Sequence, residues 1–432
     1  MPMTTNPASR PELVADGLSY PTSVAFDEDG NVYVAEAGLP FGGAAAGGRV
    51  WKLGNDGGRD LVAKDLRWPV NGLAFHLGRL YIVEGGTPGR ISYVDRGGHH
   101  VTVIDHLPGP GNYHTNMLAA GPDGKLYFSQ GAMTNTGIVG LDAYELGWLR
   151  RLPHAHDIPG HPLVLSGINV ETIDPLSGDP DARKRTGAFV PFGTPTSRGH
   201  RIEAQLPCTA AILRCGAEGG ALELVAWGLR NAYGLGFLPD GRLLAVDQGA
   251  DDRGSRPVAN APDLLFEIRG GAWYGWPDYI GGDPITDARF RPETGPAPAF
   301  VLANHDALPP PARPLLEFPP HACAVKFDAI PEGCGAWSGQ LLIALFGDER
   351  PMTAPPGARV GRAVARIDPS GWTLHPLADS GFSRPIDVRC RREDQSAYVV
   401  DFGEFEIDER KGVLARPGTG RVYRLPLGGE LR

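Results

Sequence analysis

Two histidines stand directly before apolar runs of the sequence, the first of them in the segment "GNYHTN". A neutral imidazole accepts a proton from a hydroxyl group near neutral pH, so His114 is a candidate general base. The same histidine can instead cap a strand by bonding the backbone. His321 occupies the equivalent position before a later run, beside Cys323, and is a candidate for substrate contact.

An arginine and an asparagine stand at the start of another apolar run, in the segment "WGLRNAYG". Arg230 is a candidate for binding an anion or a carbonyl oxygen, to which a guanidinium group is well suited. Asn231 follows it directly. Arg384, in "GFSRPID", holds the same position before a further run, where it either binds a ligand or pairs with Asp401. These side chains therefore need a fold that brings the starts of several strands together.

A repeated unit supplies such a fold. Each copy has an apolar strand, a turn rich in Gly and Asp, and a second apolar strand, which is typical of a β-hairpin. The clear copies are "PTSVAFDEDGNVYVAEA" (21–37), "PVNGLAFHLGRLYIVEG" (69–85), "HTNMLAAGPDGKLYFSQG" (114–131) and "NAYGLGFLPDGRLLAVDQG" (231–249), with looser copies at 321–347 and 384–403.

Further strands such as "GRVWKL" and "DLVAKDL" follow many of these hairpins and complete four-stranded sheets. Six such units predict an all-β fold, a six-bladed β-propeller of four-stranded antiparallel blades. The segment "ELVADGL" (12–18) is nearly identical to the fourth strand "ELVAWGL" (223–229) but precedes the first hairpin. Because the last blade lacks its own fourth strand, we expect the N-terminal strand to close the ring and remove an exposed edge.

We expect a single propeller domain over residues 11–427, preceded by a flexible N-terminus at 1–10. The third and fourth hairpins lie much further apart than the first three, which predicts a long insertion after the third hairpin. Long ordered excursions of this kind are usually functional loops. We therefore expect residues 132–222 to form a loop or lid over the active face.

Composition and charge exclude several classes of protein. The formal charge of −9 argues against a nucleic-acid partner, since phosphate contacts need a basic face. No segment has the length of a membrane span or the apolar core of an export signal, so we expect no membrane partner and a cytoplasmic location for the sequence as it stands, or a periplasmic or extracellular one if it is trimmed. The five cysteines do not form a disulfide framework. We expect a monomer or homodimer.

The propeller predicts which residues meet. The first strand of each blade lines the central channel and the second runs antiparallel to it, so the start of the first and the end of the second lie at the same face. Polar residues that converge on one concave spot are typical of a small-molecule site. The residues expected at this face are His114, Arg230, Asn231, His321 and Arg384, together with Glu36, Glu84, Gln130, Gln248, Asp348 and Asp401.

The stretch "VAWGLRNAYGLGFLPDGRLLAVDQGADDRGSRP", followed by "WYGWPDY", resembles the soluble glucose/sorbosone dehydrogenase family. Members of this family are six-bladed propellers that use pyrroloquinoline quinone (PQQ) with calcium. The resemblance implies a calcium-dependent oxidoreductase that oxidises a sugar or a related polyol or aldehyde. It implies that His114 is the general base, which takes the proton of the C1 hydroxyl as hydride passes to the quinone.

The resemblance also assigns the remaining roles. Arg230 and Asn231 fall on the pair that binds the carbonyl region of the quinone, with Arg230 stabilising developing negative charge. Gly249 and Ala250, next to Gln248, fall on the loop whose backbone carbonyls hold calcium. Further candidates for contacts with cofactor or substrate are Gln130, Arg350, Arg384 and His321, where Arg350 replaces a family lysine in the fifth blade.

Two alternatives stay open. The first is a quinone-free, metal-assisted hydrolase, lactonase or isomerase, with Glu36, Asn116 and Asp247 as metal ligands and His114 as acid and base. The second is a propeller that binds carbohydrate without catalysis. The number of cations at the channel mouth discriminates between the quinone enzyme and the first alternative, because a tricarboxylate cofactor needs several of them.

Overall fold

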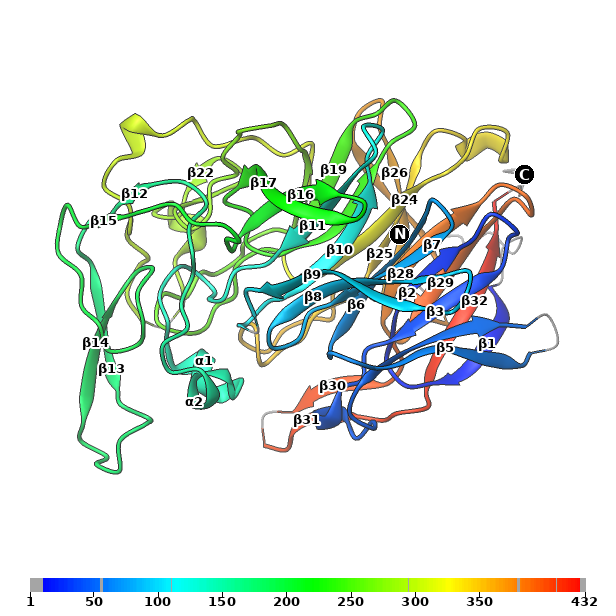
Figure 1. Ribbon diagram of the computed structural model, residues 1–432. Helices are drawn as coiled ribbons and strands as arrows, with labels where there is room; N and C mark the ends of the chain where they lie inside the picture. Colours follow the sequence, from blue (N-terminus) through cyan, green and yellow to red (C-terminus); the bar gives the residue numbers. More distant parts are fainter. Residues whose placement is uncertain are drawn as a thin grey trace.

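The computed structural model describes residues 11–427, apart from 55–56, 110, 294, 379–380 and 409. The expected flexible segment 1–10 lies outside the described residues. Six four-stranded antiparallel sheets are the blades of a β-propeller, which confirms the predicted fold (Figure 1). The first two blades consist of β2 (Pro21–Phe26), β3 (Val32–Glu36), β4 (Gly48–Leu53) and β5 (Arg59–Leu66), then β6 (Val70–His76), β7 (Arg79–Glu84), β8 (Gly89–Asp95) and β9 (His100–Leu107).

The other blades follow the same order along the chain. The third contains β10 (Thr115–Ala120), β11 (Lys125–Gln130), β16 (Ala211–Gly216) and β17 (Gly219–Trp227). The fourth contains β18 (Ala232–Phe237), β19 (Leu243–Asp247), β20 (Leu264–Glu267) and β23 (Leu316–Glu317). The fifth contains β24 (Ala324–Ala329), β25 (Leu341–Leu345), β26 (Ala363–Asp368) and β27 (Thr373–Ala378), and the sixth β28 (Pro385–Arg391), β29 (Ser396–Asp401), β32 (Gly420–Pro426) and β1 (Glu12–Leu18).

The N-terminal strand closes the ring as predicted. β1 pairs antiparallel with β32, from Glu12 opposite Arg424 to Leu18 opposite Gly420. The first strands of the blades contact one another in a complete circle, from β2 through β6, β10, β18, β24 and β28 back to β2. The outer edge of the last blade is thereby covered by a segment from the opposite end of the chain.

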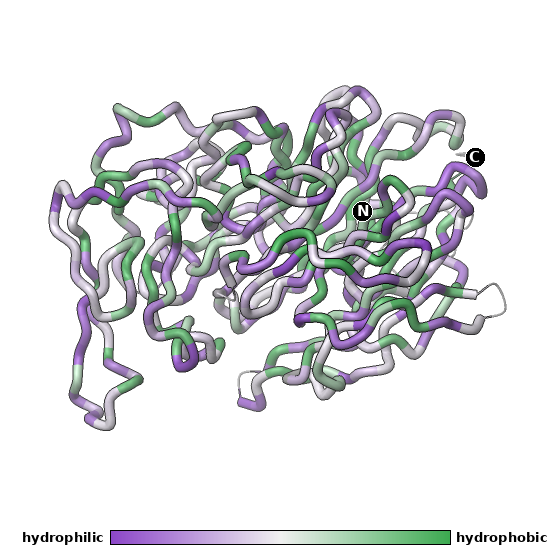
Figure 2. The backbone as a smooth tube through the Cα atoms, in the orientation of Figure 1, coloured by the Kyte–Doolittle hydropathy of each residue, from purple (hydrophilic) through white to green (hydrophobic). Residues whose placement is uncertain are grey.

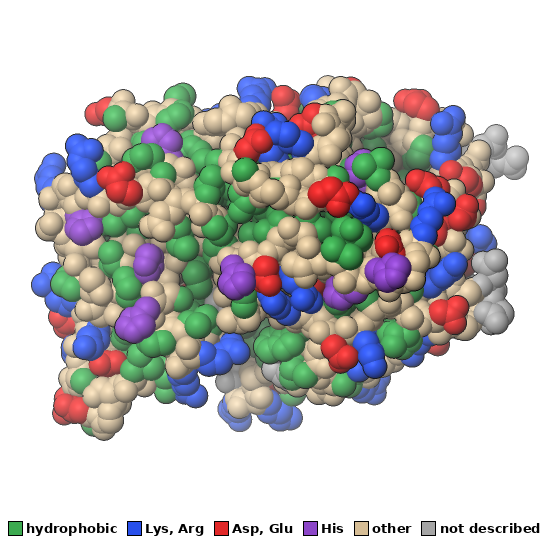
Figure 3. Space-filling view, in the orientation of Figure 1, with side chains coloured by type: hydrophobic (Ala, Val, Ile, Leu, Met, Phe, Trp, Pro, Cys, Tyr) green, Lys and Arg blue, Asp and Glu red, His purple; other side chains and the backbone are tan. Residues whose placement is uncertain are grey.

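The core lies between adjacent blades. A middle strand such as β25, "LLIAL", is buried at every residue because the neighbouring blades cover both faces of its sheet. Leu244 and Val246 of β19, for example, pack in one cluster with Leu341 and Ile343 of β25. Figure 2 shows the apolar segments distributed along the blade strands, and Figure 3 shows acidic and basic side chains interspersed over one face. None of the helices in the described part of the chain is long and apolar enough to cross a membrane.

The predicted insertion is present but shorter than 132–222, because β16 and β17 are the third and fourth strands of their blade. The inserted part lies between β11 and β16. It contains α1 (Leu141–Glu145), α2 (Trp148–Arg151) and two small two-stranded sheets, β12 (Leu163–Val164) with β15 (Arg201–Ile202) and the hairpin β13 (Asn169–Ile173) with β14 (Arg183–Gly187). Figure 1 shows β12 and β15 near β22 at one side of the propeller, and β13 and β14 extending away from them.

Smaller excursions decorate two other blades. The fourth blade carries β21 (Tyr279–Ile280) and β22 (Asp283–Pro284) between its last two strands, and the sixth carries the hairpin β30 (Phe405–Asp408) and β31 (Gly412–Ala415). The fourth-blade excursion packs on the insertion, with Leu165 bridged to Leu302. Short 3-10 turns lie at Pro40–Gly42, Ala288–Phe290, His305–Ala307 and Gly335–Trp337.

Candidate active site

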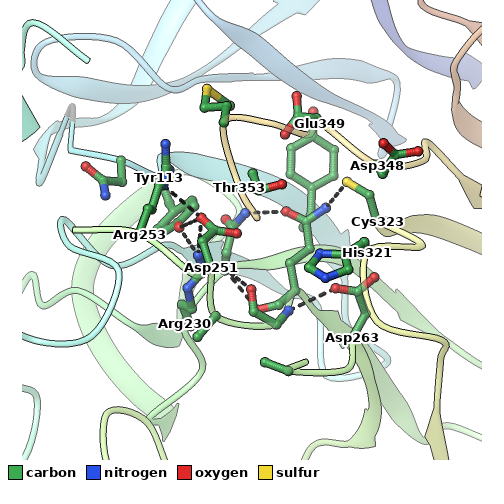
Figure 4. A pocket seen from close by; sticks show the side chains of 18 of the residues that line it. Tyr113, Arg230, Asp251, Arg253, Asp263, His321, Cys323, Asp348, Glu349 and Thr353 are labelled. Carbon is green, nitrogen blue, oxygen red and sulfur yellow. Dashed lines mark hydrogen bonds and ion pairs between the residues drawn. The ribbon is translucent and has the colours of Figure 1, made fainter. Parts of the chain in front are cut away.

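A cavity of about 520 Å³ opens where the third, fourth and fifth blades meet the inserted segment and the β30–β31 hairpin (Figure 4). Eight of the residues singled out from the sequence for catalysis, cofactor, substrate or metal binding line it together. They are His114, Asn116, Arg230, Asn231, Gln248, Gly249, Ala250 and His321. Asp348, which was expected at the same face, also lines the cavity. The prediction that the starts of first strands and the ends of second strands converge therefore accounts for most of this wall.

His114 directly precedes β10 and is partly buried. Its Nδ1 is buried and has no hydrogen-bond partner among the described residues. Burial lowers the pKa of its imidazole to about 4, although a hydrogen bond with the backbone of Gly85 opposes the shift. The ring is therefore unprotonated at neutral pH and can accept a proton, with lower basicity than a free imidazole.

Two glycines leave space for the side chains of Tyr113 and His114. A Cβ atom at Gly85 would lie 2.8 Å from the Cβ of His114, and one at Gly131 would lie 2.6 Å from the Cβ of Tyr113. Both separations are too short for real Cβ contacts. Gly85, which ends the second hairpin, thus sets how closely His114 of the next blade approaches, and Gly131 does the same for Tyr113 within the third hairpin.

Arg230 is almost completely buried, and its guanidinium is saturated by protein acceptors. Nε donates to the backbone and side-chain oxygens of Asn135 at 3.2 Å each. Nη1 donates to the carbonyls of Gln248 and Gly249. Nη2 donates to Asn135 Oδ1 at 2.9 Å, to Asp251 Oδ2 at 2.8 Å and to the Tyr113 hydroxyl. All five N–H groups are therefore used, and Arg230 acts on the cavity chiefly through its charge and as a rigid support.

Asp251 and Arg253 belong to the site although the sequence analysis did not select them. Asp251 accepts a hydrogen bond from Tyr113 at 3.0 Å and lies between Arg230 and Arg253, whose Nε is 3.2 Å from its Oδ2. Burial opposes ionisation of Asp251, but the two guanidinium groups outweigh it and the pKa of the carboxyl is lowered. The charged run "ADDRG" directly after the predicted calcium loop was the available signal.

A chain of side-chain amides crosses the cavity from blade to blade. Asn116 Nδ2 donates to Asn231 Oδ1 at 2.8 Å, and Asn231 Nδ2 donates to Gln248 Oε1 at 2.6 Å. Gln248 Nε2 donates to the sulfur of Cys323 at 2.9 Å. Burial raises the pKa of the Cys323 thiol well above its ordinary value, so the thiol stays neutral. The chain fixes the orientation of each amide toward the cavity.

The predicted calcium loop has one carbonyl that protein groups leave free. The carbonyl of Gly249 accepts from Arg230, and its N–H donates to Asp263 Oδ1 at 2.9 Å. The carbonyl of Ala250 accepts no hydrogen bond from the described residues. Within the described chain, no group of three or more His, Cys, Asp or Glu side chains has metal-binding geometry. A cation here would depend on backbone carbonyls and on oxygens of a bound ligand.

The opposite wall is acidic. Glu349 and Asp348 line it beside His321, whose pKa is lowered first by burial and then by the charge of Arg350 (Figure 4). Burial raises the pKa of Glu349, which Arg384 opposes. The carboxylates of the described lining, Glu145, Asp251, Asp263, Asp348 and Glu349, outnumber the two guanidinium groups of Arg230 and Arg253. The cavity therefore favours binding of a cation over binding of an anion that has no accompanying cation.

Three predicted contact residues do not line this cavity. Gln130 is buried, accepting from Thr115 Oγ1 at 2.8 Å and donating to the carbonyl of Pro108 at 2.9 Å. Arg384 is 1% exposed, and its guanidinium donates to backbone carbonyls, including that of Asp348 at 2.6 Å. Arg350 lines a separate neighbouring cavity. Both Gln130 and Arg384 support the backbone around the site.

The acidic residues that end the second strands have a shared structural role. Glu36 accepts from the N–H of Ser19 at 2.6 Å, and Glu84 accepts from the N–H of Arg67 at 2.7 Å. In the same way, both carboxylate oxygens of Asp247 accept the N–H groups of Arg230 and Asn231, and Asp401 accepts those of Ser383 and Arg384. Arg384 therefore contacts Asp401 through its backbone N–H. Glu36, Glu84 and Asp401 do not line the cavity, and of the predicted metal ligands Glu36, Asn116 and Asp247 only Asn116 lines it.

No protein-family model matches the sequence, and no curated protein matches it. Solved structures do resemble the fold. They include the PQQ-bound aldose sugar dehydrogenase of Streptomyces coelicolor (16% identity, TM-score 0.56, covering 98% of this chain and 99% of that one). The PQQ domain of the pyranose dehydrogenase of Coprinopsis cinerea, in its holo form, is 15% identical (TM-score 0.57, 98% and 97% covered). The soluble aldose sugar dehydrogenase of Escherichia coli, in its apo form, is 14% identical (TM-score 0.55, 96% and 99% covered). At these identities the likeness establishes the shared propeller fold.

Proposed function

We propose that this protein is a dehydrogenase of a sugar or a related polyol or aldehyde, dependent on PQQ and calcium. The observation that carries the proposal is a neutral His114 imidazole in the wall of a polar cavity that Arg230 and Asn231 also line. The solved structures of the same fold support it, because they include PQQ-bound dehydrogenases of sugars.

In this proposal His114 takes the proton from the substrate hydroxyl that is being oxidised. Asn231, held by Asn116 and Gln248, has a second Nδ2 hydrogen for a ligand oxygen. The quinone, when bound, supplies the acceptor for the two electrons that leave the substrate. The inserted segment contributes Glu145 and Leu146 to the lining, which supports the predicted role of a lid.

The charges of the cavity fit a quinone that arrives with a divalent cation. The cluster of carboxylates disfavours a tricarboxylate by itself, and the free carbonyl of Ala250 is a suitable oxygen ligand for calcium. Gly249, whose carbonyl is bound by Arg230, is the weaker of the two predicted ligands. Arg253 supplies the second cationic group in the cavity, in place of the predicted Arg350 and Arg384.

A titration of the purified protein tests the proposal. PQQ is added with and without calcium while the quinone absorbance is followed, and a dye acceptor is then supplied with a panel of aldoses and polyols. We expect calcium-dependent binding and reduction of the dye by at least one sugar. Absence of binding at micromolar quinone would overturn the quinone assignment.

The base is tested separately by His114→Ala, with the exposed His106→Ala as the matched control. We expect dye reduction to fall by about 10²- to 10⁴-fold in the first variant and to be unchanged in the second. Retention of full activity by His114→Ala would remove the base from the proposal.

A further inference from the structure

Asn135 makes an unusually complete set of hydrogen bonds just behind the cavity wall. It follows β11 at the start of the inserted segment, is 3% exposed and does not line the cavity. Its Oδ1 accepts from Arg230 Nε at 3.2 Å, from Arg230 Nη2 at 2.9 Å and from the N–H of Asp251 at 3.0 Å. Its Nδ2 donates to the carbonyl of Asp251 at 2.8 Å and to that of Arg253 at 3.1 Å.

These partners allow only one orientation of the amide. With the oxygen and nitrogen exchanged, the NH₂ group would face a guanidinium and a backbone N–H, and the oxygen would face two carbonyls. The backbone oxygen of Asn135 is also bound, by Arg230 Nε at 3.2 Å and by the indole of Trp276 at 3.0 Å. The residue is therefore fixed on every side.

Asn135 holds both ends of the loop that runs from Gln248 to Arg253. It bonds residues 251 and 253 directly, and it orients Arg230, which donates to the carbonyls of residues 248 and 249. Ala250 lies between these two anchors, with its carbonyl free of protein hydrogen bonds among the described residues. Asn135 thus supports the loop directly at residues 251 and 253, and through Arg230 at residues 248 and 249.

We propose that Asn135 is a positioning residue that holds the 248–253 loop and Arg230 in the geometry that binds cation and cofactor. This inference rests on the function proposed above for the role of the loop, but the contacts themselves are independent of it. In this proposal the inserted segment has two roles. It covers the cavity, and through Asn135 it supports the loop that binds cation and cofactor.

Hydrogen exchange measured by mass spectrometry tests the positioning without any activity. In Asn135→Ala we expect the amides of Asp251 and Asp252 to exchange at least tenfold faster, with the blade strands unchanged. The matched control is Asn169→Ala, since Asn169 also donates to two carbonyls and accepts one backbone N–H, yet lies away from the cavity. Exchange in the loop that is unchanged, or that rises equally in the control, would overturn the inference.

The variant Asn135→Asp separates the two contacts and serves if the alanine variant does not fold. It keeps an oxygen toward Arg230 but turns a second oxygen toward the carbonyls of Asp251 and Arg253. We expect faster exchange in the loop while the Arg230 Nε–H signal stays protected in NMR spectra. The assignment would be contradicted if the Arg230 Nε–H signal lost its protection while hydrogen exchange in the loop stayed unchanged.

Calcium-dependent quinone binding gives the functional readout. The calcium concentration for half-maximal binding should rise tenfold or more in Asn135→Ala and stay unchanged in Asn169→Ala. An unchanged calcium requirement in Asn135→Ala would overturn the link to cofactor binding. If the unmodified protein binds no quinone, the proposed function fails, and the exchange experiment still decides whether Asn135 positions the loop.

Discussion

The lowered pKa of His114 predicts a specific pH dependence of stability. The ordinary imidazole pKa of 6.5 falls to about 4 in the folded protein because the ring is buried. Between these values the unfolded chain binds a proton that the folded protein does not, so stability falls as pH decreases from 6.5 to 4. A shift of this size corresponds to about 3 kcal/mol of unfolding free energy, which is fully present above pH 6.5.

The perturbation that isolates this contribution is His114→Gln, compared with the unmodified protein in urea denaturation at several pH values from 7 to 4. Carboxyl groups titrate in both proteins and cancel in the difference. We expect the unmodified protein to lose about 3 kcal/mol relative to the variant over this range. NMR titration of the His114 ring should give a midpoint near 4.

A difference in unfolding free energy that does not change with pH would refute the reasoning, as would a His114 midpoint near 6.5. The same pKa makes a prediction for catalysis. Because the base stays unprotonated well below neutral pH, the decline of kcat/KM on the acid side that is due to His114 should lie near pH 4 in the free enzyme.

Three further predictions follow from other contacts. Asp251→Asn should lower the unfolding free energy by about 3 kcal/mol in chemical denaturation, because Arg230 loses its buried partner; an unchanged value would mean that the pair is replaced by water. Deletion of residues 12–18 should expose the edge of β32 and cause association, visible by light scattering, whereas a monodisperse product would contradict the closure argument. Burial lowers the pKa of Lys326 from 10.5 to about 8, so stability should increase between pH 8 and 10.5 in denaturation experiments, and Lys326→Met should abolish that increase.

Much of the fold was predictable because local sequence patterns indicate which neighbouring strands pair. Alternating apolar residues and Gly-rich turns define each hairpin, and six copies define the ring. The similarity of residues 12–18 to an outer strand predicted the closure, which the pairing of β1 with β32 confirms. Strand polarity also placed His114, Arg230 and Asn231 at one mouth, since it fixes the face at which a strand begins.

The direction of individual side chains was decided only by tertiary structure. Arg384 directly precedes β28 as Asn231 directly precedes β18, and the acidic residue that ends the next strand accepts the N–H of each. Arg384 nevertheless lies under the backbone, where its guanidinium donates to carbonyls of the preceding blade, while Asn231 lines the cavity. The sequence repeat cannot predict this difference, because the partners of each side chain come in part from the preceding blade. Asp251 and Asn135 were missed for the same reason, since Asn135 binds the backbone of Asp251 from 116 residues away along the chain. Local pattern determined where the backbone goes, and long-range hydrogen bonding of buried polar groups determined which side chains reach the site.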